Sequence, residues 1–192
     1  PVRALGEAER GPGAGQGLEQ AAGLVVEHGG GVGLAVGVDG HAQVGGDWAD
    51  AFALSDGRVC LVVGDVMGSG IPAAATMGRL RTTLAAVARH VSDPARLLLD
   101  LDESLVRTGS ESIATVALVA VDPQAGVADL YSAGPLPTLL VEGAGGGGAT
   151  TANVTPPVGL GWEAHGTVPQ PFRIPFNAAA TTEIYTDGLI ET

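Results

Sequence analysis

A turn at residues 55–57, Ser-Asp-Gly, separates two apolar segments, and it constrains the fold more than any other feature of the chain. Apolar segments on both sides of an Asp-Gly turn are a strong signal for a β-hairpin. A three-residue loop with Gly57 in the left-handed conformation pairs Leu54 with Arg58, whereas a two-residue loop shifts the pairing by one residue. We prefer the three-residue loop because it gathers apolar side chains on one face. These side chains belong to Ala49, Ala51, Ala53, Val59, Leu61 and Val63.

The preferred register also brings two carboxylates together. Asp47 then lies opposite Asp65 on the same face, with Cβ atoms about 5 Å apart. In the other register Asp47 is opposite Val66, and Asp65 points to the other face. Two carboxylates this close repel each other unless they share a proton or bind a cation. Hard divalent cations take oxygen ligands, and the neighbouring glycines let carbonyl groups and water approach. The pair therefore predicts a metal site. The alternative is two ordinary turn residues, because Asp beside Gly is common in turns.

The composition limits the class of partner. The chain has 192 residues, enough for one domain with a core, and a net charge of −12. This charge argues against nucleic acid or an anionic membrane surface as partner. No run of eighteen apolar residues and no signal peptide is present, so we expect a cytoplasmic protein without membrane insertion. Cys60, the only cysteine, lies in an apolar segment and is expected to be a buried thiol.

The order of the remaining elements indicates an α+β fold. We interpret residues 1–31 as a Gly/Pro-rich lead-in that ends in a short helix over 18–28, and residues 32–192 as the domain. Helices are expected after Gly70 and after the Asp93-Pro94 cap, and a mobile loop is expected over 143–148. Strands are expected over 32–38, 113–121, 127–133, 138–142, 172–174 and 181–186. Two helices among strands joined by short turns favour antiparallel sheets.

Five motifs occur in a fixed order along residues 32–191. They are Val44-Gly-Gly-Asp-Trp-Ala-Asp50, Gly64-Asp-Val-Met-Gly-Ser-Gly70, Ser132-Ala-Gly134, Pro157-Val-Gly159 and Tyr185-Thr-Asp-Gly-Leu-Ile-Glu191. This set resembles the bacterial PPM-type serine/threonine phosphatases of the stage II sporulation protein E and RsbU branch. The resemblance implies an α-β-β-α sandwich, in which two antiparallel sheets lie face to face with helices outside.

The resemblance also implies a metal site. Two ions, Mn²⁺ or Mg²⁺, would be held by Asp47, by Asp65 as the bridging ligand, by the backbone carbonyl of Val66 and by Asp187. Asp50 is a further candidate that would bind through water. Asp47, Asp65 and Asp187 would act in catalysis through a metal-bound water.

The implied activity is hydrolysis of phosphoserine or phosphothreonine on a regulatory protein. The substrate would be a phosphorylated STAS-type anti-anti-sigma factor or a similar phosphoprotein. An upstream sensor domain or a homodimer would control the activity.

Several departures from the family pattern favour an alternative. Ala49 stands where Tyr is common, Ser69 where His or Asn is common, and Pro135 where His is common. The 192 residues end before an Asp-Asp-x-Thr motif that supplies another metal ligand in the family. The alternative is a degenerate or truncated phosphatase fold that acts as a non-catalytic binding or regulatory module.

Overall fold

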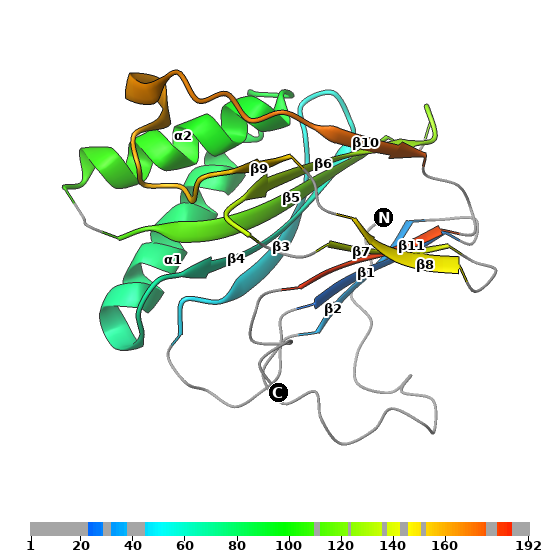
Figure 1. Cartoon of the computed structure of the whole chain (residues 1–192), viewed down its shortest axis with the longest axis horizontal. Helices are drawn as coiled ribbons and strands as arrows, with labels where there is room; N and C mark the ends of the chain where they lie inside the picture. The colour runs from blue at the N-terminus through cyan, green and yellow to red at the C-terminus, as the bar shows by residue number, and fades with distance from the viewer. Residues whose placement is uncertain are drawn as a thin grey trace.

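Two β-sheets and a pair of α-helices make up the described part of this computed structural model (Figure 1). The structure describes residues 45–109, 112–122, 124–135 and 153–175 in full, and the backbone of 23–28, 32–37, 138–142, 146–150 and 180–185. Nearly all strand pairs are antiparallel; the short strand β9 is parallel to its neighbour. The predicted α+β class with two antiparallel sheets is confirmed.

The six-stranded sheet carries the hairpin. Its order is β10-β6-β5-β4-β3, with β9 paired to β6. The strands are β3 (Trp48–Ala53), β4 (Val59–Val66), β5 (Ala114–Asp122), β6 (Val127–Ala133), β9 (Val154–Thr155) and β10 (Phe172–Pro175). Consecutive strands β3 to β6 are neighbours: β3–β4 and β5–β6 are hairpins with short turns, and both helices lie between β4 and β5 in the sequence.

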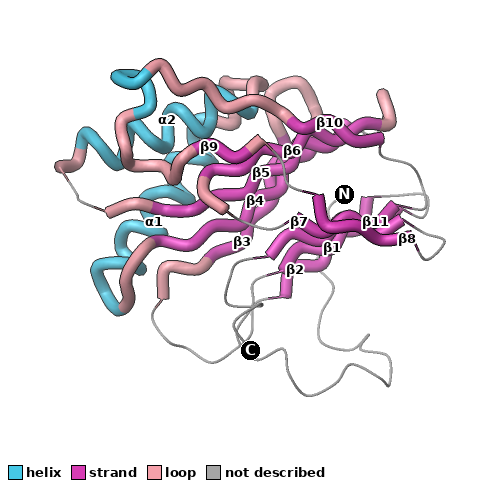
Figure 2. Tube along the Cα trace, in the orientation of Figure 1, coloured by secondary structure: helices cyan, strands magenta, loops and turns pink. Residues whose placement is uncertain are grey.

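The second sheet has five strands in the order β2-β1-β11-β7-β8, and its strand β1 contacts β4. The strands are β1 (Gly23–His28), β2 (Val32–Gly37), β7 (Thr138–Glu142), β8 (Gly146–Thr150) and β11 (Ala180–Tyr185). Figure 2 shows the two sheets as separate layers, with the helices on the far side of the six-stranded sheet. The described residues therefore form three layers: the pair of helices, the six-stranded sheet and the five-stranded sheet.

Two expectations from the sequence are wrong. The short helix expected over 18–28 is not formed at residues 23–28, which are strand β1 and pair with both β2 and β11. Valines favour strands, and a helix this short is marginal without tertiary support. The loop expected over 143–148 gives way to a strand from Gly146, because β8 pairs with β7 along its length. Strand pairing uses backbone groups and so does not require apolar side chains at these glycines.

The two helices cover one face of the six-stranded sheet. Helix α1 (Gly70–Val87) and helix α2 (Pro94–Arg107) follow each other and pack together (Figure 1). Asp93 caps α2, since its Oδ1 accepts a 3.0 Å hydrogen bond from Ala95 N. The buried leucines at every third or fourth position pack on the sheet, as expected for amphipathic helices. They include Leu80, Leu84, Leu98, Leu101 and Leu105, against Val62 and Leu118.

The opposite face of this sheet has its own apolar cluster. It contains Leu61, Val63, Ala117, Val119 and Leu130, with Ala49, Ala51 and Val59 packed against it. This is the face that the preferred hairpin register predicts. Among the described segments, no helix has the length and apolar character needed to cross a membrane.

Candidate metal centre

The hairpin has the register that the three-residue loop predicts. Trp48 pairs with Gly64, and Ala53 pairs with Val59. Gly57 has a φ of 88°, and Leu54 N donates a 2.8 Å hydrogen bond to Arg58 O. Only glycine adopts this left-handed conformation without strain. The turn therefore determines on which face of the sheet each side chain of the hairpin lies.

The pairing continues to the two aspartates. Val66 N donates a 3.2 Å hydrogen bond to Gly46 O, one step beyond the Trp48–Gly64 pair. Asp47 therefore lies opposite Asp65, on the face away from the helices. Asp47 is exposed and Asp65 is half-buried. The structure brings together the two residues that the sequence singled out.

Gly46 lets the backbone approach the second aspartate closely. A Cβ atom at this position would lie 2.9 Å from Asp65 Oδ1 and closer still to the carbonyl oxygen of Val66. Both oxygens thus lie beside Gly46, in space that any other residue would fill. Carboxylate and carbonyl oxygens are the ligands that Mg²⁺ and Mn²⁺ prefer.

The described residues fit part of a site for such an ion. They supply the carboxylates of Asp47 and Asp65 and the carbonyl of Val66. Across the described ranges, no group of three or more His, Cys, Asp or Glu side chains is placed to hold a metal. Asp187, the third predicted carboxylate ligand, lies outside the described residues.

Asp50 does not lie beside Asp47 and Asp65, so the structure does not support the prediction that it binds a metal ion through water. Alternate residues of a strand face opposite sides, so Asp50 lies on the helix side of β3. Its Oδ2 accepts hydrogen bonds from Arg81 Nε and Nη2, both 3.2 Å long. Its Oδ1 accepts a 2.9 Å bond from Ala51 N. Asp50 thus joins β3 to α1.

Trp48 is a site residue that the sequence reasoning missed. Its side chain is 2% exposed, and its ring covers Gly64, where a Cβ atom would lie 2.6 Å from Cζ2. This cross-strand contact is directly beside the aspartate pair. In the described part of the chain, Trp48 Nε1 is a buried donor without a hydrogen-bond partner. The signal was present in the sequence, because the preferred register places Trp48 opposite a glycine.

Two further motifs meet the hairpin at this end of the sheet. Thr115 pairs with Asp65, and a Cβ atom at Gly134 would lie 2.6 Å from Thr115 Cγ2. Met67 N donates a 2.9 Å hydrogen bond to Ile113 O, next to Gly159. The Ser132–Gly134 and Pro157–Gly159 motifs therefore support the strand ends that carry the aspartates.

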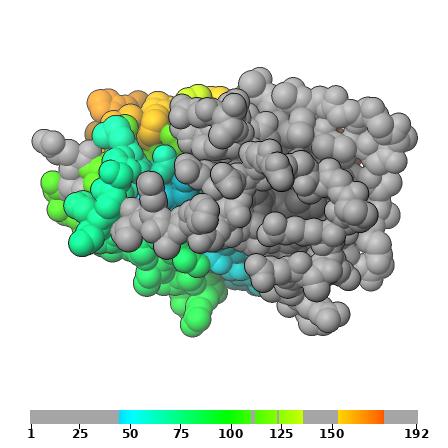
Figure 3. Space-filling model, turned by 90° about the horizontal axis from the view of Figure 1, so that it is seen from below, coloured from blue at the N-terminus to red at the C-terminus, as the bar shows by residue number. Residues whose placement is uncertain are grey.

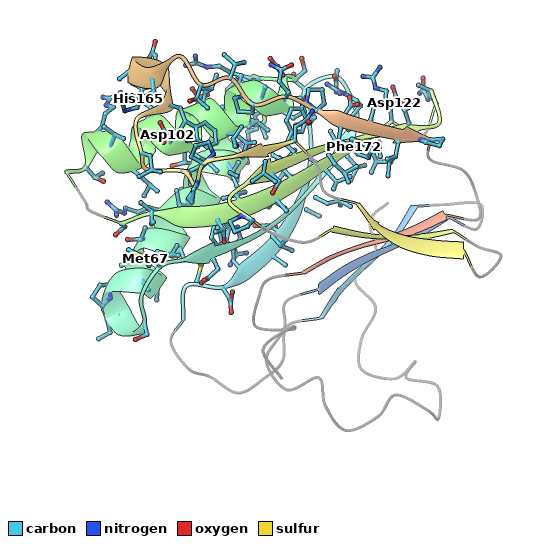
Figure 4. The ribbon with its side chains drawn as sticks, in the orientation of Figure 1. Met67, Asp102, Asp122, His165 and Phe172 are labelled. Carbon is cyan, nitrogen blue, oxygen red and sulfur yellow. The ribbon has the colours of Figure 1, made fainter. Side chains whose placement is uncertain are left out.

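Asp102 holds the loop of the fourth motif and was also missed. Its buried carboxylate accepts hydrogen bonds from the backbone N–H groups of Gly159, Leu160, Gly161 and Trp162, at 2.7–3.2 Å. Figure 4 labels Asp102 in α2, beside the segment that leads to the short 3₁₀ helix Trp162–His165. An acidic residue on an amphipathic helix is normally solvent-exposed, so the sequence pattern does not predict the buried role of Asp102.

Comparisons with known proteins identify the family and the fold. The family described as Stage II sporulation protein E (SpoIIE) matches residues 55–192. The structure of the RsbU and RsbW domains of Rv1364c from Mycobacterium tuberculosis is 31% identical, with a TM-score of 0.70; the match covers 90% of this chain and 44% of that one. The SiaA-PP2C domain of Pseudomonas aeruginosa is 20% identical with a TM-score of 0.62, covering 75% of this chain and 56% of that one.

The PP2C phosphatase domain and regulatory fragment of SpoIIE from Bacillus subtilis shares the fold at 17% identity. Its TM-score is 0.62, and the match covers 90% of this chain and 46% of that one. The chain thus spans about half the length of these three structures. The family match covers more than half of the chain, and four of the five sequence motifs meet at the aspartate pair. The chain belongs to the stage II sporulation protein E family of PPM-type phosphatases.

Proposed function

We propose that this chain hydrolyses phosphoserine or phosphothreonine on a regulatory protein, with Mn²⁺ or Mg²⁺ as cofactor. Asp47, Asp65, Asp187 and the carbonyl of Val66 would hold two ions. The observation that carries the proposal is the pairing of Asp47 with Asp65 where four family motifs meet. The two facing carboxylates, with the Val66 carbonyl beside Asp65, form an oxygen-rich set of donors of the kind that Mg²⁺ and Mn²⁺ bind.

The chain's own residues supply binding and position. When bound, the ions would lower the pKa of water and offset the charge of the phosphoryl oxygens. Asp65, between Gly46 and Thr115, has its backbone fixed by strand pairs on both sides. Cys60 does not offer a nucleophile, because burial raises the pKa of its thiol and hides it from substrate.

The proposed substrate is a phosphorylated STAS-type anti-anti-sigma factor. The similarity to an RsbU domain whose structure also holds an RsbW domain supports a substrate in that regulatory system. An upstream sensor domain or a homodimer would then set the activity. A substrate of this kind would place the enzyme in the cytoplasm.

The test compares two aspartates with a matched control in the same hairpin. Asp47→Asn and Asp65→Asn should each lower Mn²⁺-dependent hydrolysis of p-nitrophenyl phosphate by at least about 100-fold, because each removes a charged metal ligand. Millimolar Mn²⁺ should raise the Tm of the wild type by mass action, and Asp65→Asn should remove this rise. Asp50→Asn lies on the other face and should keep both properties.

The outcomes separate the candidate functions. Stabilisation by Mn²⁺ without hydrolysis of p-nitrophenyl phosphate or of a phosphoserine peptide would support the non-catalytic binding module. A Tm that ignores Mn²⁺, with no hydrolysis, would contradict the metal site itself. Equal losses in the Asp50→Asn protein would show that the hairpin, rather than the carboxylate pair, is being disturbed.

A further inference from the structure

The loop that follows Asp65 exposes two large apolar side chains. Met67 is 60% exposed and Ile71 is 79% exposed. Gly68 and Ser69, which follow Met67, are exposed as well. We call residues 67–72, which comprise the loop after β4 and the first turn of α1, the site loop. Figure 4 labels Met67 at the end of β4 from which α1 begins.

The site loop is held in place although its side chains are exposed. Backbone hydrogen bonds fix its start, from Val66 N to Gly46 O and from Met67 N to Ile113 O. Gly68 and Gly70 have φ values of 104° and 75°, in the left-handed region, and no heavy atom would lie within 4 Å of a Cβ at either position. Residues 70–72 form the first turn of α1, and Figure 3 shows this part of the chain at the molecular surface. A fixed backbone that presents apolar groups to solvent is typical of an interaction surface.

The charges around the loop favour apolar contact with a partner. Residues 59–78 contain no arginine or lysine. The next two arginines are engaged elsewhere, since Arg81 pairs with Asp50 and Arg79 donates to Thr76 Oγ1 at 3.1 Å. The site loop thus presents methionine and isoleucine side chains to a substrate, and no cationic side chain.

We propose that Met67 and Ile71 bind apolar side chains that flank the phosphorylated residue of the substrate, and so select among phosphoproteins. This inference rests on the proposed function. Met67 is two positions after Asp65, so the two Cα atoms lie within about 7 Å of each other. A substrate segment whose phosphoryl group reaches Asp65 would therefore pass close to the start of the site loop. Residues within about three positions of the phosphoserine would then cover Met67 and Ile71.

Three synthetic peptides test this proposal. Each carries one phosphoserine, flanked on both sides by leucine and isoleucine, by glycine and serine, or by arginine. With Mn²⁺, the wild-type chain should hydrolyse the apolar peptide with a kcat/KM at least about fivefold above that of the glycine–serine peptide. In the double variant Met67→Ser/Ile71→Ser this ratio should fall to about one.

A matched control replaces two other exposed apolar residues. Val154→Ser/Val168→Ser changes side chains that are 52% and 57% exposed on β9 and beyond the 3₁₀ helix, and it should keep the wild-type ratio. Circular dichroism and the Mn²⁺-induced rise in Tm show that each variant folds and binds metal. A ratio that survives in the Met67/Ile71 variant overturns the inference. If both double variants prefer the arginine peptide, the inference is overturned as well. A wild type that hydrolyses no phosphoester defeats the proposed function, and the inference with it.

Discussion

At the scale of single residues, glycines decide how closely the strands can approach beside the carboxylates. Gly46 leaves room for Asp65 Oδ1 and the Val66 carbonyl, and Gly64 leaves room for the ring of Trp48. The buried ring seals the helix side of the hairpin, while the aspartates occupy the other side. Among the described residues, no group accepts a hydrogen bond from Trp48 Nε1; a buried donor left so costs about 1–3 kcal/mol, which the burial of a large ring offsets.

Gly46→Ala should disturb the metal site more than the fold. Its Cβ would meet backbone atoms of Val66 and the Asp65 carboxylate, which lack space to retreat. We expect a loss of about 1–3 kcal/mol in the free energy of unfolding, and a smaller Tm rise with Mn²⁺. Urea unfolding with and without Mn²⁺ measures both effects.

Gly78→Ala is the control for that substitution. Gly78 lies inside α1, and no atom would be within 4 Å of its Cβ. Alanine should therefore stabilise the protein by about 0.5–1 kcal/mol. A Gly46→Ala protein as stable as Gly78→Ala, with an unchanged response to Mn²⁺, would contradict the crowded geometry at Gly46.

At the scale of elements, the sequence predicted correctly those helices and strands that depend on interactions between residues close together in the chain. The Ser-Asp-Gly turn fixed the register of β3 and β4, and the Asp93 cap marked the start of α2. Strands β1 and β8 were missed because they form through pairing with other strands, β11 and β7, and not through a pattern in their own side chains. Asp50 was assigned to the metal side from its nearness in sequence, although strand alternation turns it toward Arg81. Asp102 was missed because its partners lie nearly 60 positions away in the sequence.

Helix α2 and the 159–162 segment are joined through Asp102, and this link should be essential for stability. Asp102→Ala would leave several backbone N–H groups without an acceptor, each at a cost of about 1–3 kcal/mol when buried. We expect the free energy of unfolding to fall by at least about 3 kcal/mol in urea.

Asp100→Ala on the same helix provides the comparison. Asp100 pairs with Arg96 at 2.7 Å, and the arginine side chain is 54% exposed. Such surface pairs contribute up to about 1 kcal/mol. Equal losses from the two substitutions would show that the hydrogen bonds of Asp102 add little beyond a surface charge.

At the scale of the whole molecule, charge opposes the proposed reaction. The net charge of −12 repels phosphorylated proteins at a distance, while the site itself depends on cations. Salt screens such repulsion over about 8–10 Å at physiological ionic strength. Binding over the site loop would then rely on short-range apolar contact.

Moderate salt should therefore raise the rate. At fixed Mn²⁺, an increase in ionic strength from about 0.05 to 0.2 M should raise kcat/KM for an acidic phosphoserine peptide, because repulsion is screened. A phosphoserine peptide with zero net charge should respond less. A kcat/KM that falls with salt for the acidic peptide would indicate that arginine side chains attract the substrate instead.

The pairing of β1 with β11 has a consequence for folding during synthesis. Gly23 lies opposite Tyr185, so the two strands are separated by most of the chain. The β3–β4 hairpin can close as soon as it leaves the ribosome, whereas β1 must wait for β11 to be translated. Contacts of such high sequence separation form slowly and leave strand edges open meanwhile. The hairpin that carries Asp47 and Asp65 can therefore pair before the second sheet is complete, whereas the edge of β1 that pairs with β11 stays open until β11 is made.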